Sequence, residues 1–441
     1  MKEFHKGDLT KHIIDLSWPM LLGNILLNGA AAFELFMLGK IGVETLAAYS
    51  IAMSSVWALF NSVHGGLINA AMAVVSRKYG AKRHGEINAA LPGMLFTGVV
   101  FFSVFALVCY AIMVPAFVFF GAKGAVLKQV TGYMSISLLL SFIMPFYSQL
   151  LGVSRGMGDS MTPLKIICVL VPLNILLNAI FIGPMGLGIM GAAYSAVATY
   201  VVGAALYTVV FIRGIGGIKL RPGPVKNGLF FTYAWLSVKS ILQNFTNDAG
   251  SMIMLRIISP FGNTFIAAYG IVSRLINFLM MAGWPICNSG GVIVGHNLGA
   301  GIRKRAVETI LASTKVFLWI TVPTAALFFF WAAPVMGAFS SDAAVIEFGR
   351  QFLMIIAPAL LFMALGQACQ SGFSGAGFIG TPTLVNILAF IIIRPLLSVA
   401  LDRLPSAGSS GVFWAMSVSF VFYGIVYWLI YKNERWANKE I

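Results

Sequence analysis

One long apolar segment occurs twice in this chain, and the repeat limits the folds that are possible. Residues 17–51 align without a gap with residues 237–271. Each copy consists of an apolar stretch, a short turn that contains glycine and the start of a second apolar stretch. The first stretch of each copy contains an acid, Glu34 or Asp248. A carboxylate costs about 2.5–3.5 kcal/mol at the centre of a bilayer, so both acids are candidates for a functional site.

The repeat extends beyond this segment. Gly80-Ala81 matches Gly299-Ala300, and Thr162-Pro163 matches Thr381-Pro382, with the same separation in both cases. That separation agrees with the opening segment to within one residue, so all three matches follow one period. The sequence therefore predicts two halves with the same order of elements.

The composition is typical of an integral membrane protein. Of the 441 residues, 59% are hydrophobic and 10% are charged, whereas soluble domains contain about 25% charged residues. The net charge of +15 does not indicate a nucleic-acid partner, because the basic residues fall in short breaks between apolar runs and not on one soluble face. We therefore expect the protein to contact membrane lipid and to bind no nucleic acid.

Twelve apolar runs are each long enough to cross a bilayer, which needs about 20 residues. They are residues 13–38, 46–76, 90–114, 127–153, 163–183, 190–212, 232–258, 264–298, 307–336, 345–372, 381–401 and 410–431. The predicted fold is an all-α integral membrane protein of twelve transmembrane helices.

The period divides these helices into two lobes of six. We predict an N-terminal lobe at 1–212, a cytoplasmic linker rich in Gly, Pro and basic residues at 213–231, and a C-terminal lobe at 232–441. Because six is even, both lobes enter the membrane from the same side, which makes this a parallel repeat.

Lysine and arginine are concentrated in every second break between the runs. One side has basic residues within 2–11, 77–83, 155–165, 213–226, 303–305 and 432–439. The opposite loops hold only Lys40, Lys123, Lys128 and Arg403. The positive-inside rule then places both termini in the cytoplasm. We expect a multi-pass protein of the plasma membrane, as in a prokaryotic inner membrane.

Several short motifs resemble the multidrug and toxic compound extrusion (MATE) family. The similarity covers nearly the whole chain in the family's order. The motifs are Trp18-Pro19, Glu34 with Gly39 at the first turn, Leu46-Ala47-Ala48, the GxGDxxTP loop at 156–163, Asn174 with Asn178, Gly191-Ala192-Ala193, 267–271 (AAYGI) and 295–300 (GHNLGA).

The resemblance implies two six-helix lobes around a central cavity and an antiporter. Such proteins export small organic compounds, often cationic, in exchange for inward H⁺ or Na⁺. We therefore expect small-molecule substrates, a monomer and no cofactor other than the coupling ion. No nucleophile triad, phosphate loop or metal-ligand spacing indicates an enzyme.

The chain departs from the family's ion sites. The family usually has Asp where this chain has Glu34, and the positions of a Gln and a Tyr beside that acid in one branch are Leu27 and Ala30. The sodium-coupled branch has a Glu on helix seven, which aligns with Asn247, and an Asp on helix ten. The tenth run here, at 345–372, contains no acid deeper than Glu347. The coupling ion therefore stays open between H⁺ and Na⁺.

Glu34 is predicted to bind that ion on the outer half of the first lobe. Asn174 and Asn178 stand at positions i and i+4, so they share one helix face and can complete a shell around a cation. The alternatives are an interfacial Glu34 exposed to water and two amides that only join helices.

Asp248, with Asn247 beside it, is the second predicted ion site. Asp248 lies deep in the seventh run, at 232–258. Its alternative is a purely structural hydrogen-bonded acid. Lys239 lies about 13 Å away along a helix and on another face, so a direct ion pair is not expected. We expect Lys239 to extend to the cytoplasmic interface.

Four polar residues are predicted to line a substrate cavity, and the roles of two intramembrane arginines stay undecided. The cavity residues are Asn24, Asn28, Asn244 and His64, although packing is the alternative for His64. Arg274 and Arg394 lie inside apolar runs, and a structural role is favoured for both; Pro395 frees a carbonyl that Arg394 could bind.

Two other classes of function remain as alternatives. A flippase for a lipid-linked precursor shares this architecture, and an exposed intramembrane arginine would favour it. A membrane-embedded receptor or enzyme would need a sensing domain or a catalytic constellation, and neither is present in the sequence.

Overall fold

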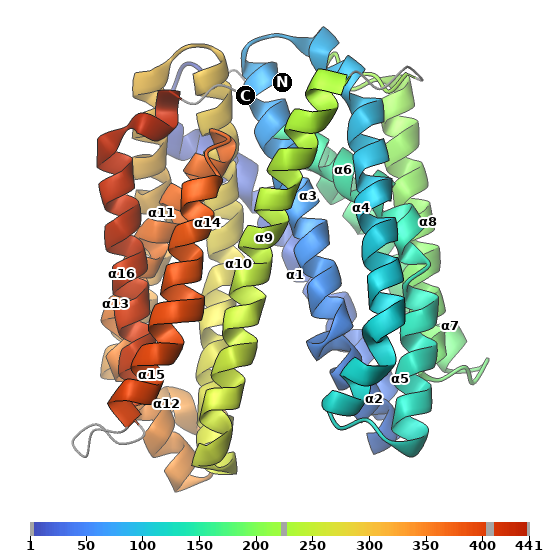
Figure 1. Ribbon diagram of the computed structural model, residues 1–441, viewed down its shortest axis with the longest axis vertical. Coiled ribbons are helices and arrows are strands. Elements are labelled where there is room, and N and C mark those ends of the chain that lie inside the picture. Colours follow the sequence, from blue (N-terminus) through green and yellow to red (C-terminus); the bar gives the residue numbers. More distant parts are fainter. Residues whose placement is uncertain (1–3, 222–226, 403–409, 439–441) are drawn as a thin grey trace. The chain divides into compact units, whose positions relative to one another are not determined.

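The computed structural model describes residues 4–221, 227–402 and 410–438 (Figure 1). These residues form helices and turns, and the one extended feature among them is an isolated bridge between Ile215 and Ile218. The predicted all-α class is confirmed. The predicted linker at 213–231 includes residues 222–226, which lie outside the described residues, as does Arg403.

The chain packs into two compact units. Unit 1 is Pro19–Ile241, and unit 2 combines Leu242–Ile441 with the segment that ends at Trp18. Two helices contribute to both units, α1 (Leu9–Gly39) and α9 (Asn227–Ile258). The unit boundaries therefore fall inside helices, whereas the predicted lobes at 1–212 and 232–441 follow the sequence period. That division into lobes stays a prediction.

Unit 1 contains the first half of the repeat. After α1 come α2 (Val43–Ser54), α3 (Val56–Gly80), α4 (His84–Phe119), α5 (Gly124–Ser137), α6 (Leu140–Gly156), α7 (Met161–Ile182) and α8 (Ile189–Arg213). The run at 46–76 is divided between α2 and α3, because the backbone at Ser55 is not helical and its hydroxyl donates to the Ile51 carbonyl at 2.5 Å. The run at 127–153 is divided between α5 and α6, which meet at a bend of 52°.

Unit 2 contains the second half. After α9 come η1 (Ser259–Phe261), α10 (Asn263–Gly299), α11 (Arg303–Phe330), α12 (Ala332–Gly337), α13 (Ala343–Gly375), α14 (Gly380–Asn386), η2 (Ile387–Ile393), α15 (Arg394–Asp402), α16 (Gly411–Asn433) and η4 (Arg435–Asn438). The segment η2 is a π-helix, so α14, η2 and α15 together form the eleventh predicted run.

Ten described helices are long and apolar enough to cross a membrane, and the bent pair of α5 and α6 makes an eleventh. The remaining predicted run corresponds to α9, whose apolar character is interrupted by Asn244, Asn247 and Asp248. Each of the twelve runs thus coincides with one helix or one broken helix. The protein is a multi-pass membrane protein.

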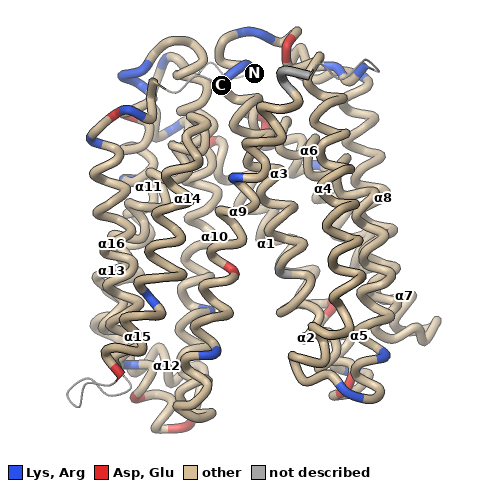
Figure 2. The backbone as a smooth tube through the Cα atoms, in the orientation of Figure 1, with Lys and Arg blue, Asp and Glu red and all other residues tan. Residues whose placement is uncertain are grey.

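Charged residues are distributed unevenly along each unit. Figure 2 shows that most lysines and arginines lie at one end of the helices, in the loops and helix ends, and that few lie within the spans. This pattern is the one from which we predict cytoplasmic termini, and the orientation itself stays a prediction.

Small residues let the same pair of helices approach closely in both units. In unit 1, a Cβ on Gly156 of α6 would lie 3.1 Å from the Met72 carbonyl oxygen of α3. In unit 2, a Cβ on Gly375 of α13 would overlap the Gly291 carbonyl of α10. Small residues at such crossings permit the close backbone approach that stabilises helix pairs in membranes.

We predict that Gly375→Ala destabilises the protein. The added methyl group overlaps backbone that cannot move aside without shifting a helix, and overpacking of this kind costs about 1–3 kcal/mol. The matched control is Gly270→Ala within α10, where nothing lies within 4 Å of the new Cβ. Thermal unfolding in detergent is the measurement; equal midpoints for the two variants would contradict the helix crossing described here.

Candidate functional site

The helices of unit 1 place a group of polar side chains around Glu34. Glu34 lies on the last part of α1, which ends at Gly39, and its side chain is half-buried. Tyr49 of α2 donates a hydrogen bond to its carboxylate. The side chain therefore has a fixed partner, in contrast to a carboxylate that only faces water.

Two amides of α7 connect Glu34 to α8. Asn178 donates to Glu34 Oε2 at 3.4 Å and to Asn174 Oδ1 at 3.1 Å. Asn174 in turn donates to Thr199 Oγ1 of α8 at 3.3 Å, and Thr199 donates to the Ser195 carbonyl at 2.7 Å. The i, i+4 spacing of the amides places both on one helix face, as the sequence predicts.

Aromatic side chains enclose this group. The ring of Tyr133 packs against that of Tyr49 with centroids 5.9 Å apart. Tyr133 and Tyr200 also lie close enough to Glu34 for its charge to act on their hydroxyl groups. Sequence reasoning missed Tyr49 and Thr199 as members of the site, although Tyr49 belongs to the repeated Ala-Ala-Tyr motif, which could have indicated it.

The electrostatics of the group suit a cation or a proton. Among the described residues, no lysine or arginine forms an ion pair with Glu34, and Oδ1 of the fully buried Asn178 has no hydrogen-bond partner. Carboxylate, amide and hydroxyl oxygens are acceptors that can surround a small hard cation, and the carboxylate can also take up a proton. Within the same described residues, no three His, Cys, Asp or Glu side chains come together as a transition-metal site would require.

Comparison with known proteins identifies the family. The MatE family model matches residues 19–180 and 240–399, which together form most of the chain, and each range includes most of one copy of the repeated segment. The chain belongs to the MATE family. Members of this family are membrane transporters, so the predicted resemblance and the prediction that the protein is not an enzyme are both confirmed.

The relatives of this MATE protein are distant but match along all or nearly all of its length. It is 22% identical to a probable multidrug resistance protein, YpnP, of Bacillus subtilis, over 100% of this chain and 98% of the relative. It is 21% identical to the multidrug export protein MepA of Staphylococcus aureus, over 94% and 92% of the two chains.

Solved structures confirm the fold. A MOP superfamily transporter from Pyrococcus furiosus superimposes with a TM-score of 0.89 at 19% identity, and the match covers 99% of this chain and 98% of that one. The MATE transporter VcmN of Vibrio cholerae in its bent form gives a TM-score of 0.87 at 22% identity, with 97% of both chains covered. The MATE protein thus has the twelve-helix fold of this family.

The predicted ion residues of α9 form a separate group in unit 2. The side chain of Asn247 is exposed, and those of Asp248 and Asn244 are half-buried. Lys239 lies over the ring of Trp235 at 4.7 Å. Whether Asp248 takes part in ion binding stays a prediction.

The residues predicted to line a substrate cavity lie in different surroundings. Asn28 is exposed and donates to the Asn24 carbonyl of its own helix at 2.8 Å. His64 stacks on Tyr147 with ring centroids 6.2 Å apart, a contact that favours the packing alternative. Their role in substrate binding stays a prediction.

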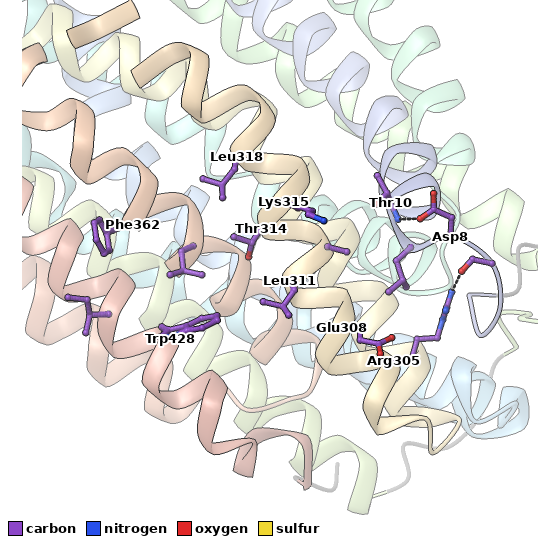
Figure 3. Close-up of a pocket in the computed structure, with 15 residues that line it drawn as sticks. Asp8, Thr10, Arg305, Glu308, Leu311, Thr314, Lys315, Leu318, Phe362 and Trp428 are labelled. Carbon is purple, nitrogen blue, oxygen red and sulfur yellow. Dashed lines mark hydrogen bonds between the residues drawn. The ribbon is translucent and has the colours of Figure 1, made fainter. Parts of the chain in front are cut away.

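One cavity among the described residues is lined by none of these four residues (Figure 3). It has a volume of about 970 Å³ and lies in unit 2 between the start of α1 and helices α11, α13 and α16. Arg305, Glu308 and Lys315 of α11 lie along one side, whereas Phe362 and Trp428 belong to its apolar part. The guanidinium of Arg305 is already engaged, because it donates to two backbone carbonyls of the N-terminal segment at 2.8 Å and 2.7 Å.

The two intramembrane arginines differ. Arg274 of α10 is exposed, whereas Arg394 of α15 is only 8% exposed. The sequence suggested that Arg394 could bind a backbone carbonyl freed by Pro395. Instead, its Nε donates a hydrogen bond to the hydroxyl of Ser419 at 2.9 Å. Its guanidinium also lies over two phenyl rings, those of Phe390 at 4.6 Å and Phe420 at 4.8 Å.

We predict that Asn178→Ala lowers the free energy of unfolding by about 1–3 kcal/mol, because it leaves the Glu34 carboxylate and Asn174 without their shared donor. The matched control is Asn61→Ala on the exposed face of α3, which should change stability by less than about 0.5 kcal/mol. Denaturant titration in mixed micelles measures both. A loss for Asn178→Ala no greater than that of the control would contradict the hydrogen-bonded group.

Proposed function

We propose that this protein exports amphipathic organic compounds, often cationic, in exchange for an inward H⁺ or Na⁺. The names of its relatives support the substrate class, since MepA is a multidrug export protein and YpnP a probable multidrug resistance protein. The observation that supports the coupling is the Glu34 group, in which a half-buried carboxylate that forms no ion pair within the described part of the chain lies beside the Asn178 amide oxygen, which has no hydrogen-bond partner there.

The proposed cycle alternates access to the two sides of the membrane. From outside, the ion binds Glu34 and neutralises it, which changes the hydrogen bonds that Asn178 and Tyr49 donate to the carboxylate. Ion binding can shift the conformational equilibrium only by as much as its affinity differs between the two states. The hydrogen bonds around Glu34 are a physical source of that difference. On the inside, the ion leaves and substrate loads.

Helix α1 supplies a mechanical connection for this cycle. Its residues up to Trp18 pack in unit 2, whereas the part with Glu34 packs in unit 1. Pro19 stands at the change between the units, and a proline inside a helix removes one backbone hydrogen bond and favours a kink. A change at Glu34 therefore acts on a helix that both units share.

The proposed driving force is the electrochemical gradient of the coupling ion. Each charge that crosses the membrane contributes about 2.3 kcal/mol per 100 mV, in addition to any gradient of pH or Na⁺. The proposal places both termini in the cytoplasm of a prokaryotic cell, with the protein acting as a monomer in the plasma membrane. It requires no cofactor apart from the ion.

We predict that Glu34→Gln reduces the efflux of a fluorescent cationic dye from cells to the rate of cells that lack the protein. The substitution keeps the shape of the side chain but removes the group that binds the ion. The matched control is Glu44→Gln in the first turn of α2, an exposed acid, which should retain wild-type efflux.

Asp248→Asn, alone and combined with Glu34→Gln, separates the two predicted acids. Wild-type efflux from the double variant would refute ion binding at both. Loss of efflux in Asp248→Asn with full efflux in Glu34→Gln would move the site to α9.

An anionic lipid-linked precursor is the second candidate substrate, and the exposed Arg274 on α10 is the observation that favours it. The export of cationic compounds predicts that Arg274→Gln does not lower dye efflux, because a guanidinium repels a cation and is not a binding partner for it. Flipping of an anionic lipid predicts the opposite pattern, with no dye efflux by the wild type and loss of lipid translocation in Arg274→Gln. Dye efflux from cells and translocation of a labelled anionic lipid in proteoliposomes measure the two.

A further inference from the structure

The repeat gives every member of the Glu34 group a counterpart in unit 2. Each residue and its counterpart are separated in sequence by the same number of positions as residues 17–51 and 237–271. In one pair alone the separation is one position shorter. Glu34 corresponds to Met254, Tyr49 to Tyr269, Asn174 to Arg394, Asn178 to Ser398, Thr199 to Ser419 and, as the closer pair, Tyr133 to Phe352.

The contacts among these counterparts repeat those of the Glu34 group. Asn174 donates to Thr199 at 3.3 Å, and Arg394 donates to Ser419 at 2.9 Å. Asn178 contacts Glu34, and Ser398 contacts the sulfur of Met254 at 3.7 Å. The two units therefore build the same site from corresponding helices.

The aromatic neighbours agree as well. The rings of Tyr49 and Tyr133 are 5.9 Å apart, and those of Tyr269 and Phe352 are 5.8 Å apart. Tyr269 lies near enough to Arg394 to interact with its charge, as Tyr49 does with Glu34.

The π-helical segment η2 sets the register of this second site. Pro163 and Pro382 lie at the starts of the two corresponding helices, and Asn178 and Ser398 lie further along them. The separation between the two prolines is one position shorter than the separation between Asn178 and Ser398. The contacts of Ser398 follow the longer separation. A π turn accommodates one residue more than an α turn, and such turns occur frequently at functional sites. The extra residue of η2 brings Arg394, in place of Ile393, to the position that Asn174 occupies in unit 1.

The polarity of the second site is reversed. Its carboxylate is replaced by the fully buried thioether of Met254, and an amide is replaced by the guanidinium of Arg394. The unpartnered polar atom of the first site is an acceptor, Asn178 Oδ1, whereas that of the second is a donor, Arg394 Nη2. The first site therefore attracts a cation, and the second contains one already.

Aromatic rings compensate this buried charge. A buried guanidinium is strongly destabilising unless it is paired, and among the described residues Arg394 forms no ion pair. The faces of Phe390 and Phe420 lie under it at 4.6 Å and 4.8 Å, and a desolvated cation is attracted to the negative face of an aromatic ring. The second site thus holds a cation without any acid.

We propose that the guanidinium of Arg394 occupies, in unit 2, the place that the coupling cation takes in unit 1. The proposal rests on ion binding at Glu34 as proposed above. The duplicated site of unit 2 binds no exchangeable cation, because a tethered one already fills it. Of the two repeated sites, only that of unit 1 loads and releases an ion, so the pair contributes one ion to each transport cycle.

Exchanging residues between the two sites tests this proposal. Met254→Glu together with Arg394→Asn gives unit 2 the carboxylate and amide of unit 1, and it should bind one additional H⁺ or Na⁺ per molecule. Met254→Glu alone should bind no additional ion, because Arg394 neutralises the new carboxylate. The control Arg394→Asn alone should also bind none, since no acid is present. Ion binding to the purified full-length protein is measured by proton release and by Na⁺ titration calorimetry.

Three results would overturn the proposal: no additional ion in the double variant, an additional ion in Met254→Glu alone, or saturable binding of chloride by the wild type that Arg394→Asn abolishes. The last result would make the site an anion site. If the double variant does not elute as a monodisperse protein, Met254→Glu alone still decides, because a carboxylate that pairs internally with Arg394 gives a thermal midpoint that does not depend on Na⁺. A midpoint that rises only with added Na⁺ would contradict the tethered cation.

The same measurements separate this inference from the proposed function. Loss of one bound ion in Glu34→Gln supports the ion site of unit 1 whatever the unit 2 variants do. If Glu34→Gln loses no ion but the double variant gains one, ion binding at Glu34 fails, and what remains is that Arg394 fills a cation site in unit 2.

Discussion

A carboxyl group enclosed by transmembrane helices needs hydrogen-bond partners in place of water, and this constraint organises unit 1 around Glu34. Tyr49 and Asn178 donate to the carboxylate from α2 and α7, and Asn174 extends the contacts to α8. These donors fix the arrangement of four helices around one titratable group. Because the group has no counter-ion among the described residues, its energy changes strongly when a cation or proton arrives.

Unit 2 buries a charge of the opposite sign at the corresponding site. Its corresponding site replaces the acid with Met254 and holds the guanidinium of Arg394 between two phenyl rings and a serine hydroxyl. Duplication therefore preserved the scaffold of the site but not its chemistry. One copy remains open to an external cation, whereas the other carries its own, and this asymmetry is consistent with a transporter in which a single lobe responds to the ion.

The sequence predicted much of the fold, because length, apolar character and repetition are visible in the chain itself. It also predicted that Asn174 and Asn178 share a face near Glu34, since an i, i+4 spacing defines a helix face. The sequence did not predict the break between α2 and α3 at Ser55, because no proline or glycine lies there and the apolar run continues through it. The π turn at 387–393 escaped for the same reason, since every residue in it is apolar, and the role of Arg394 became visible only when that turn supplied the register.

The central claim is that one exchangeable ion binds at Glu34 and leaves when substrate binds. Purified protein in weakly buffered or Na⁺-containing detergent solution measures this directly, as the number of H⁺ or Na⁺ released per molecule on addition of a saturating cationic substrate. The account predicts release of one ion by the wild type and none by Glu34→Gln. Equal release by both proteins would contradict it.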